Sequence, residues 1–184
     1  PQDAAQAALA TGAIGVSLFE KAAVMVDYPH NGKRRATSVS GVLSRADEFH
    51  HMTLDAGRFF TDAEAEHGLG VVILSQKLAR ELAAGDDPHR LLDKAVRVNG
   101  ASMSVIGVLA AYAGETSCDA YVPFQTGRKI FPPSDPPRPS TILLRASSVE
   151  EVDQLKAAAE DWAARHYARL EKVDIHTQRA RVEQ

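Results

Sequence analysis

Residues Val96–Leu109 have the sequence Val-Arg-Val-Asn-Gly-Ala-Ser-Met-Ser-Val-Ile-Gly-Val-Leu, and they are the strongest indication of the fold. Asn99-Gly100 supplies the two positive-φ residues of a type I′ turn. Gly107, inside the second apolar run, indicates a bulge or a close approach of another backbone segment. This stretch therefore predicts a β-hairpin whose second strand is irregular.

The segment before the hairpin carries two helix starts. Thr61, followed three residues later by Glu64, fits a capping box, in which each side chain binds the other residue's backbone N–H. Ser75 follows the apolar run Val71–Leu74 and predicts the N-cap of a helix that ends near Ala84. A buried strand is therefore expected between two short helices.

That second helix has a simple amphipathic pattern. Leu78 and Leu82 stand four residues apart and predict its buried face. Gly85-Asp-Asp-Pro88 is expected to end it.

Strand and turn signals recur along the rest of the chain. Asn31-Gly32 predicts another hairpin, and the prolines between Pro132 and Pro139 predict an exposed connector. The other expected strands are Gly15–Tyr28 (as one strand or two), Thr37–Leu43, Tyr121–Phe124, Thr141–Ala146 and Lys172–Thr177, and the other expected helices are Asp3–Ala10 and Val149–Tyr167.

Hairpins and β-α-β passages therefore occur in the same chain. This mixture favours an α+β fold with mixed sheets over a doubly wound parallel sheet. The β-α-β passages Val71–Val98 and Thr141–Thr177 stand on opposite sides of the proline-rich connector. We therefore expect two lobes.

Composition limits the classes of function. The chain has 184 residues, a net charge of −3 and one cysteine, Cys118. The charge does not indicate a general nucleic-acid surface, and one cysteine allows neither an internal disulfide nor a thiolate metal cluster. The apolar runs are far shorter than the roughly 20 residues of a membrane-spanning helix.

The histidines do not form a convincing metal site. His50-His51 lie near Asp47 and Glu48, but adjacent side chains of an extended segment point to opposite faces and chelate poorly. His166 falls on the last turn of a predicted helix, where a cation suits the helix dipole. His30 and His67 fall in predicted turns, and these positions favour structural roles.

Nucleophile and phosphate motifs are also missing. Ser75 is explained by N-capping, and Cys118 has Asp119 beside it and no basic neighbour that would lower its pKa. Gly68-Leu-Gly70 precedes a strand, which is the wrong context for a phosphate loop. Arg58 favours a surface or inter-lobe salt bridge. We therefore assign no catalytic, cofactor-binding or metal-binding residue.

The order of these phrases resembles the extracytoplasmic core domain of MacB/FtsX-type ABC transporter permeases. The phrases are Gly57-Arg58-Phe59, Val71–Ala79, the hairpin Val96–Val108 and Tyr121–Phe124, and the closing strand and helix from Thr141 to His166 also fit the family. One departure precedes the hairpin, where the family pattern has a Pro-x-Gly phrase and this chain has no glycine before Lys94.

This resemblance implies a non-catalytic domain inserted between the first and second membrane helices of a permease, on the periplasmic or extracytoplasmic face of the bacterial inner membrane. Residues 1–50 and 118–184 would form a discontinuous β-α-β membrane-proximal lobe, and residues 51–117 an inserted distal lobe. The implied function is mechanical coupling of cytoplasmic ATP hydrolysis to substrate export or extraction, or to activation of a partner protein. The implied partners are a second permease copy, a cytoplasmic ATPase and, as a further candidate, a periplasmic adaptor protein.

Two other hypotheses remain open at this point. A ligand-binding or sensor domain of another membrane protein would share the α+β layout and the lack of catalytic residues. An enzyme would require a deep pocket that gathers His50, Asp47 and Arg58. The isolated domain is expected to be a monomer or a weak dimer and to bind no ATP.

Overall fold

The chain is described by a computed structural model, which defines residues 15–43, 52–133 and 141–145 and, within one helix, residues 151, 153–154, 156–158 and 160–161. Internal contacts divide the chain into two compact units. Unit 1 contains Pro1–Val16 and Ile142–Gln184, and unit 2 contains Ser17–Thr141. These limits differ from the expected lobe limits at residues 50/51 and 117/118, because segments 17–43 and 119–130 pack with the central strands.

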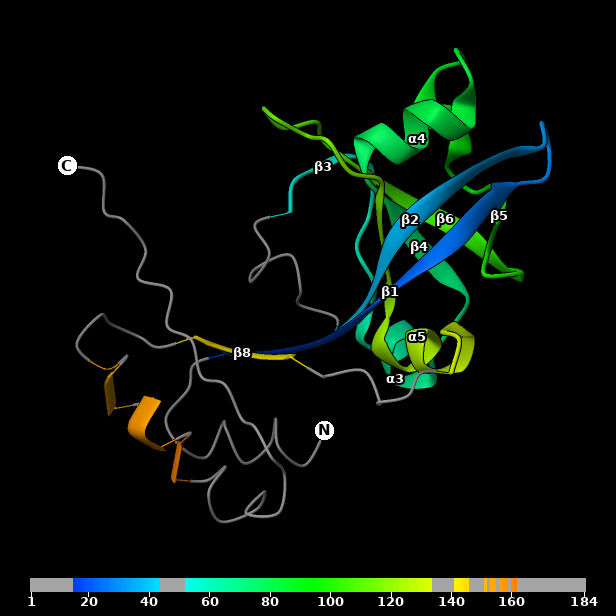
Figure 1. Cartoon of the computed structure of the whole chain (residues 1–184). Helices are drawn as coiled ribbons and strands as arrows, with labels where there is room; N and C mark the ends of the chain where they lie inside the picture. Colours follow the sequence, from blue (N-terminus) through cyan, green and yellow to red (C-terminus); the bar gives the residue numbers. More distant parts are fainter. Residues whose placement is uncertain are drawn as a thin grey trace. The chain divides into compact units, whose positions relative to one another are not determined.

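Strands dominate unit 2 (Figure 1). In chain order the elements of the described residues are β1 (Gly15–Tyr28), β2 (Lys33–Val42), β3 (Leu54–Gly57), α3 (Asp62–His67), β4 (Val71–Leu74), α4 (Gln76–Ala83), the 3-10 helix η1 (Pro88–Leu91), β5 (Ala95–Val98), β6 (Ala101–Leu109), β7 (Asp119–Pro123), α5 (Phe124–Ile130) and β8 (Thr141–Arg145). The order of hydrogen-bonded strands is β2-β7-β4-β6-β5-β1-β8, and β1 also pairs with β2. The pairings from β2 through β1 therefore close into a ring.

The sheet is mixed, as the sequence predicts. β4 runs parallel to β6 and β2 runs parallel to β7, whereas β1–β2, β5–β6 and β4–β7 are antiparallel. Valine side chains from most of these strands meet in one core with no exposed surface; they include Val26, Val39, Val72, Val96, Val105 and Val122. β-branched residues suit such a sheet because they pack well on a pleated surface.

Both predicted hairpins are present, and their turns differ. Asn99 and Gly100 have φ values of 49° and 83°, which are the two positive angles of the predicted tight turn between β5 and β6. In the β1–β2 turn only Gly32 is positive, at 73°, and the Asn31 amide donates a hydrogen bond of 2.8 Å to the Leu82 carbonyl at the end of α4. This second asparagine therefore joins the hairpin to a helix.

The irregularity predicted at Gly107 is confirmed in both senses. The register between β4 and β6 shifts where Ile73 pairs with Gly107, so that Ile106 is an extra residue. A Cβ atom at Gly107 would lie 2.8 Å from the Arg58 carbonyl oxygen. The glycine at the bulge therefore leaves room for the backbone of Arg58, which follows β3.

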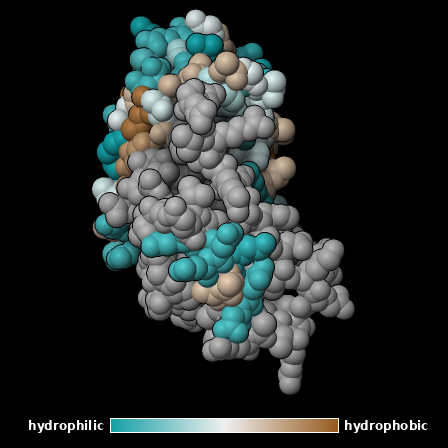
Figure 2. All heavy atoms as spheres, turned by 90° about the vertical axis from the view of Figure 1, so that its left-hand side faces the viewer, coloured by the Kyte–Doolittle hydropathy of each residue, from teal (hydrophilic) through white to brown (hydrophobic). Residues whose placement is uncertain are grey.

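Helix α4 covers one end of unit 2, and α3 and α5 lie together at the other end (Figure 1). The Thr61–Glu64 capping box and the Ser75 N-cap are both formed, and Leu78 and Leu82 are completely buried. Figure 2 shows mainly hydrophilic residues at the end where α4 lies. The predicted amphipathic pattern of α4 is therefore confirmed.

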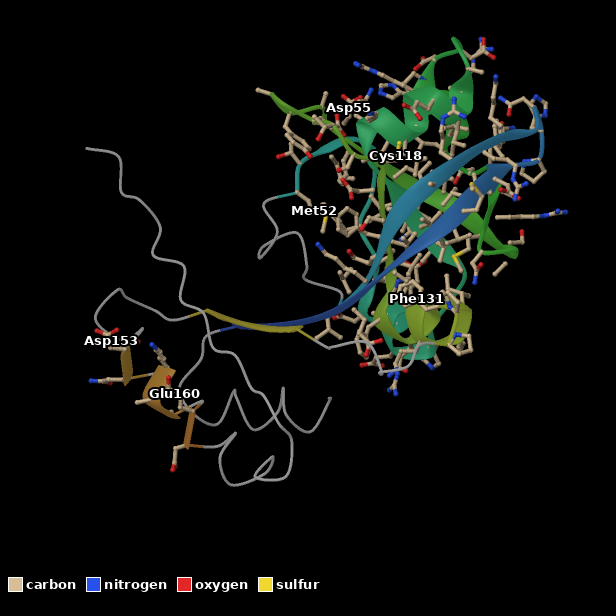
Figure 3. The ribbon with its side chains drawn as sticks, in the orientation of Figure 1. Met52, Asp55, Cys118, Phe131, Asp153 and Glu160 are labelled. Atoms are coloured by element: carbon tan, nitrogen blue, oxygen red, sulfur yellow. The ribbon has the colours of Figure 1, made fainter. Side chains whose placement is uncertain are left out.

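Helix α5 was not expected, and Phe124, predicted as a strand end, is its first residue. Pro123 ends β7, which pairs with β2 on one side and with β4 on the other, so the proline marks a strand end within the sheet. A Cβ atom at Gly127 would lie 3.2 Å from the Gly41 Cα atom and 3.1 Å from the Phe131 ring. Figure 3 shows Phe131 beside α5. Close packing on β2 therefore stabilises a helix that contains glycine.

The passage from Val71 to Val98 is not a simple β-α-β unit. β4 pairs with β6, and β5 lies on the far side of β6. β8 is formed as expected, and in unit 1 the described residues between 151 and 161 are helical. The predicted segments Asp3–Ala10 and Lys172–Thr177, and the apolar positions of the long helix, lie outside the described residues.

Candidate functional site

A sharp corner connects β3 to α3 and begins at Gly57. Gly57 has φ 85°, and a Cβ atom at this position would lie 2.2 Å from the Ile106 carbonyl oxygen. That oxygen accepts a hydrogen bond of 2.9 Å from the Arg58 backbone N–H. Only glycine combines this backbone angle with such a close approach.

The Arg58 side chain binds the capping box that follows. Its two guanidinium nitrogens donate to the two Glu64 carboxylate oxygens at 2.6 Å and 3.1 Å. The same carboxylate accepts the Thr61 backbone N–H at 2.9 Å, and the Phe59 carbonyl accepts a further bond from Arg58 at 3.1 Å. The salt bridge expected for Arg58 is therefore present, and it lies within unit 2.

Glu64 is held strongly in its ionised form. Hydrogen bonding to Arg58 lowers the pKa of Glu64 to about 2, against an opposing effect of burial, and the bonds from Thr61 add to the lowering. Only 12% of this side chain is exposed. The corner is therefore a rigid structural element whose charges are already paired.

A shallow pocket of about 320 Å³ lies next to this corner. It is lined by Gly57, Arg58, Leu92, Asp93 and Ile106. The pocket lies between two segments, Gly57-Arg58 and Leu92-Asp93, and each of them binds the backbone of β6. The Arg58 N–H binds the Ile106 carbonyl at 2.9 Å, and the Asp93 N–H binds the Val105 carbonyl at 2.8 Å.

Asp93 is unusual among the residues that line the pocket. It is exposed, and its φ of 62° is in the left-handed region, which aspartate tolerates better than most residues. It stands immediately before Lys94, which precedes β5. Within the described ranges no side chain forms a hydrogen bond or an ion pair with its carboxylate, although its charge contributes to raising the pKa of Arg58.

An ion pair links the segment that contains η1 to β3. The His89 Nε2 atom, on η1, lies 2.6 Å from an Asp55 carboxylate oxygen on β3. This hydrogen bond is the main cause that raises the pKa of His89, and the charges of Asp55 and Asp87 add to it. Figure 3 shows Asp55 near the end of unit 2 where α4 lies.

Two of the residues considered as metal ligands, His30 and His67, lie in the part of the chain that the structure describes. Asp47, Glu48, His50, His51 and His166 lie outside the described residues. His30 lies in the exposed β1–β2 turn, and the His67 ring is 2.8 Å from the Ala63 carbonyl oxygen in its own helix. Among the residues that the structure describes, no group of three or more His, Cys, Asp or Glu side chains could hold a metal ion.

Ser75 and Cys118 have structural surroundings. The buried Ser75 hydroxyl accepts hydrogen bonds from the backbone N–H groups of Leu78 and Asp119, at 3.3 Å and 3.1 Å. Burial raises the pKa of Cys118 to about 11, and the carboxylate of Glu81, 3.5 Å from the sulfur, adds to the rise. These contacts support the interpretations of Ser75 as a cap and of Cys118 as an unreactive thiol.

Sequence reasoning missed the pocket, its acidic residue Asp93, and the role of Asp55 on β3. One local signal was available, because Asp87-Pro88 is a typical start of a short helix and would have placed His89 on it. The pairing of His89 with Asp55, 34 residues away, has no local signal.

No described helix is long and apolar enough to cross a membrane. The profile of the family described as "MacB-like periplasmic core domain" matches residues 1–162. Among curated proteins, the uncharacterized ABC transporter permease YknZ of Bacillus subtilis (strain 168) is 34% identical over 137 residues, which cover 73% of this chain and 32% of YknZ. The macrolide export ATP-binding/permease protein MacB of Nitrosomonas europaea is 26% identical over 117 residues, which cover 59% of this chain and 17% of MacB.

Two solved structures share the fold. The extracellular domain of the transporter YknZ from Gram-positive bacteria gives a TM-score of 0.75 at 19% identity and covers 91% of this chain and 83% of that one. The periplasmic region of MacB from Actinobacillus actinomycetemcomitans gives 0.73 at 20% identity and covers 90% and 73%.

The chain spans a third or less of the length of the curated relatives that it matches. The matching family profile describes a periplasmic domain, which lies outside the cytoplasm. The family match covers most of the chain, and the two structural likenesses extend the agreement to the fold. The protein therefore belongs to the MacB-like periplasmic core domain family and is an extracytoplasmic domain of an ABC transporter permease of the MacB/YknZ type.

Proposed function

We propose that this domain is a non-catalytic mechanical relay of its transporter. Cytoplasmic ATP binding and hydrolysis would move two permease copies, and their extracytoplasmic domains would move with them to expel or extract a substrate or to act on a partner protein. The observation that carries this proposal is the family match over residues 1–162. The residues that the sequence suggested for chemistry and that the structure describes have structural contacts, which agrees with a relay.

The same proposal extends to the lobes. We infer that the unit holding both chain ends stands nearer the membrane and that unit 2, Ser17–Thr141, is the inserted distal lobe. The strands of unit 2 pair in a closed ring, which leaves few free strand edges. A second permease copy, an ATPase and a periplasmic adaptor are the proposed partners.

Spin labels on the parent permease test the relay directly. The complete transporter would carry Cys118→Ser, to remove the native thiol, and Lys33→Cys in the exposed β1–β2 hairpin as the labelling site. Distances between labels on two copies would be measured by pulsed electron paramagnetic resonance without nucleotide and with ATP trapped by vanadate. We expect two different distance distributions.

A label in unit 1 provides the matched control, because unit 1 is proposed to stand nearer the membrane. Glu151→Cys, at an exposed helical position, should show a smaller change than the label in unit 2. Identical distributions in both nucleotide states, with ATP hydrolysis intact, would contradict the relay. The absence of any distance between two copies would contradict the proposed dimer.

A further inference from the structure

The pocket beside Arg58 has the features of a contact site for another protein. Its volume, about 320 Å³, is at the lower end of the roughly 300–1,000 Å³ that small-molecule pockets occupy. Leu92 is half-buried and Ile106 is buried, so the pocket has an apolar side. A single long side chain fits this space better than a large transported compound does.

The charged residues at the pocket determine whether the incoming side chain should be positively or negatively charged. Arg58 already donates to both oxygens of Glu64 and to the Phe59 carbonyl. An incoming anion would therefore have to compete with a bidentate salt bridge. Asp93 supplies the remaining charge, and among the described residues none forms a hydrogen bond or an ion pair with its carboxylate.

The strand beside the pocket favours a protein as the source of the cation. β3 pairs with β6, and no other described strand pairs with β3. The register shifts between Leu54 and Ala56, so Asp55 lies in an irregular part of the pairing. An extended segment could use backbone groups at this edge, as in strand addition, while one of its side chains enters the pocket.

We propose that a lysine side chain, presented by an extended segment of a partner protein, docks in this pocket. Its aliphatic stem lies against Leu92 and Ile106, and its ammonium group pairs with Asp93. Lysine suits both parts of the site because it combines an apolar stem with a charged end. The proposal rests on the proposed function, since the partner would be a protein that the extracytoplasmic domain of the transporter meets.

Nuclear magnetic resonance of the ¹⁵N-labelled 184-residue chain tests this directly. The probe is the capped peptide acetyl-Thr-Val-Lys-Val-Thr-amide, and the matched peptides replace its lysine by norleucine or glutamate. We expect saturable shifts of the Gly57, Asp93 and Gly107 amide signals with the lysine peptide. The norleucine peptide should bind about tenfold more weakly, which corresponds to about 1.4 kcal/mol.

Asp93→Asn removes the charge at a position with φ 62°, a backbone angle that asparagine also tolerates. This variant should melt at nearly the same temperature and lose the preference for lysine over norleucine. Asp86→Asn, at an exposed residue in the turn after α4, is the matched control and should keep that preference.

Three results would overturn the proposal. One is the absence of shifts at the pocket with the lysine peptide up to about 10 mM, which is weaker than the range of specific recognition. Another is an unchanged lysine preference in Asp93→Asn. The last is equal binding of free butylamine, which would identify a small-amine site without a protein partner. None of these results depends on transport, so each leaves the mechanical relay untouched.

Discussion

The two ion pairs Arg58–Glu64 and His89–Asp55 differ in their surroundings. Glu64 is 12% exposed, accepts two bonds from Arg58 and also completes a helix cap. His89 and Asp55 are 45% and 40% exposed and share one hydrogen bond. The comparison shows how the same kind of contact can be structural in one place and weakly held in another, because solvent screens exposed charges.

The largest effect on stability is expected from a substitution of Gly57, the residue before Arg58. Gly57→Ala should lower the free energy of unfolding by more than about 3 kcal/mol, because it combines a left-handed backbone with a Cβ atom 2.2 Å from the Ile106 carbonyl oxygen. Urea denaturation followed by circular dichroism measures this change.

Gly100→Ala is the control for this substitution. Its φ of 83° is close to the 85° of Gly57, but no atom lies within 4 Å of the position that a Cβ would take. The loss should be only about 1–2 kcal/mol, the cost of the backbone angle alone. Equal losses in the two variants would show that the close approach at Gly57 is unimportant.

An intermediate effect on stability is expected from a substitution within the Arg58–Glu64 pair. Glu64→Gln should destabilise the chain by about 2 kcal/mol at pH 7, because it weakens both the bond to Arg58 and the helix cap. The pKa of Glu64 is lowered from 4.5 to about 2, so its stabilising effect is present above pH 4.5 and is lost as the pH falls through that interval.

Urea denaturation at pH values from 7 to 2 would check this prediction. The difference between the native chain and Glu64→Gln should shrink below pH 4.5, whereas Glu66→Gln, at an exposed residue of the same helix, should stay close to the native chain throughout. A difference that does not depend on pH would contradict the role of the carboxylate charge.

The smallest effect is expected at the exposed pair. The pKa of His89 is raised by Asp55, so this pair stabilises the fold fully below pH 6.5 and its contribution is lost as the pH rises through the pKa of the folded state. Asp55→Asn should lower the His89 pKa toward its ordinary value, which a titration of the ring signals by nuclear magnetic resonance would measure.

Salt sharpens the comparison between the pairs. Raising the ionic strength should reduce the shift in the His89 pKa more than that of Glu64, since the Glu64 carboxylate is largely shielded from solvent. A His89 pKa that stays high in concentrated salt would mean that hydrogen-bond geometry, rather than charge, holds this pair.

Local sequence signals predicted the turns and helix caps of the fold well. Asn99-Gly100, the Thr61–Glu64 capping box and the Ser75 cap are formed as expected, because each depends on residues that are neighbours in the sequence. Gly107 predicted the bulge in a similar way, since a glycine inside a strand is typical of a bulge or of a close backbone approach.

Other parts of the fold had no such signal. Helix α5 contains Gly127, which weakens a helix locally, and its close contact with Gly41 on β2 was not visible in the sequence. The placement of β4 beside β6 rather than β5, and the closure of β1 onto β2, also depend on contacts between distant residues.

The candidate site shows the same division. The sequence suggested that Arg58 forms a salt bridge, but not that Glu64 is its partner or that Asp93 lies across a pocket from it. The residues that line the pocket come from three segments, near 57, 92 and 106.

The sequence by itself determined the family, the turns, the caps and most strands, because these follow from short-range backbone preferences and from the order of recognisable phrases. Only the tertiary structure decided which strands pair, where the compact units divide and which charges meet at the pocket. Pairing partners are chosen by burial and hydrogen bonding summed over the whole sheet, and no local pattern in the chain encodes that sum.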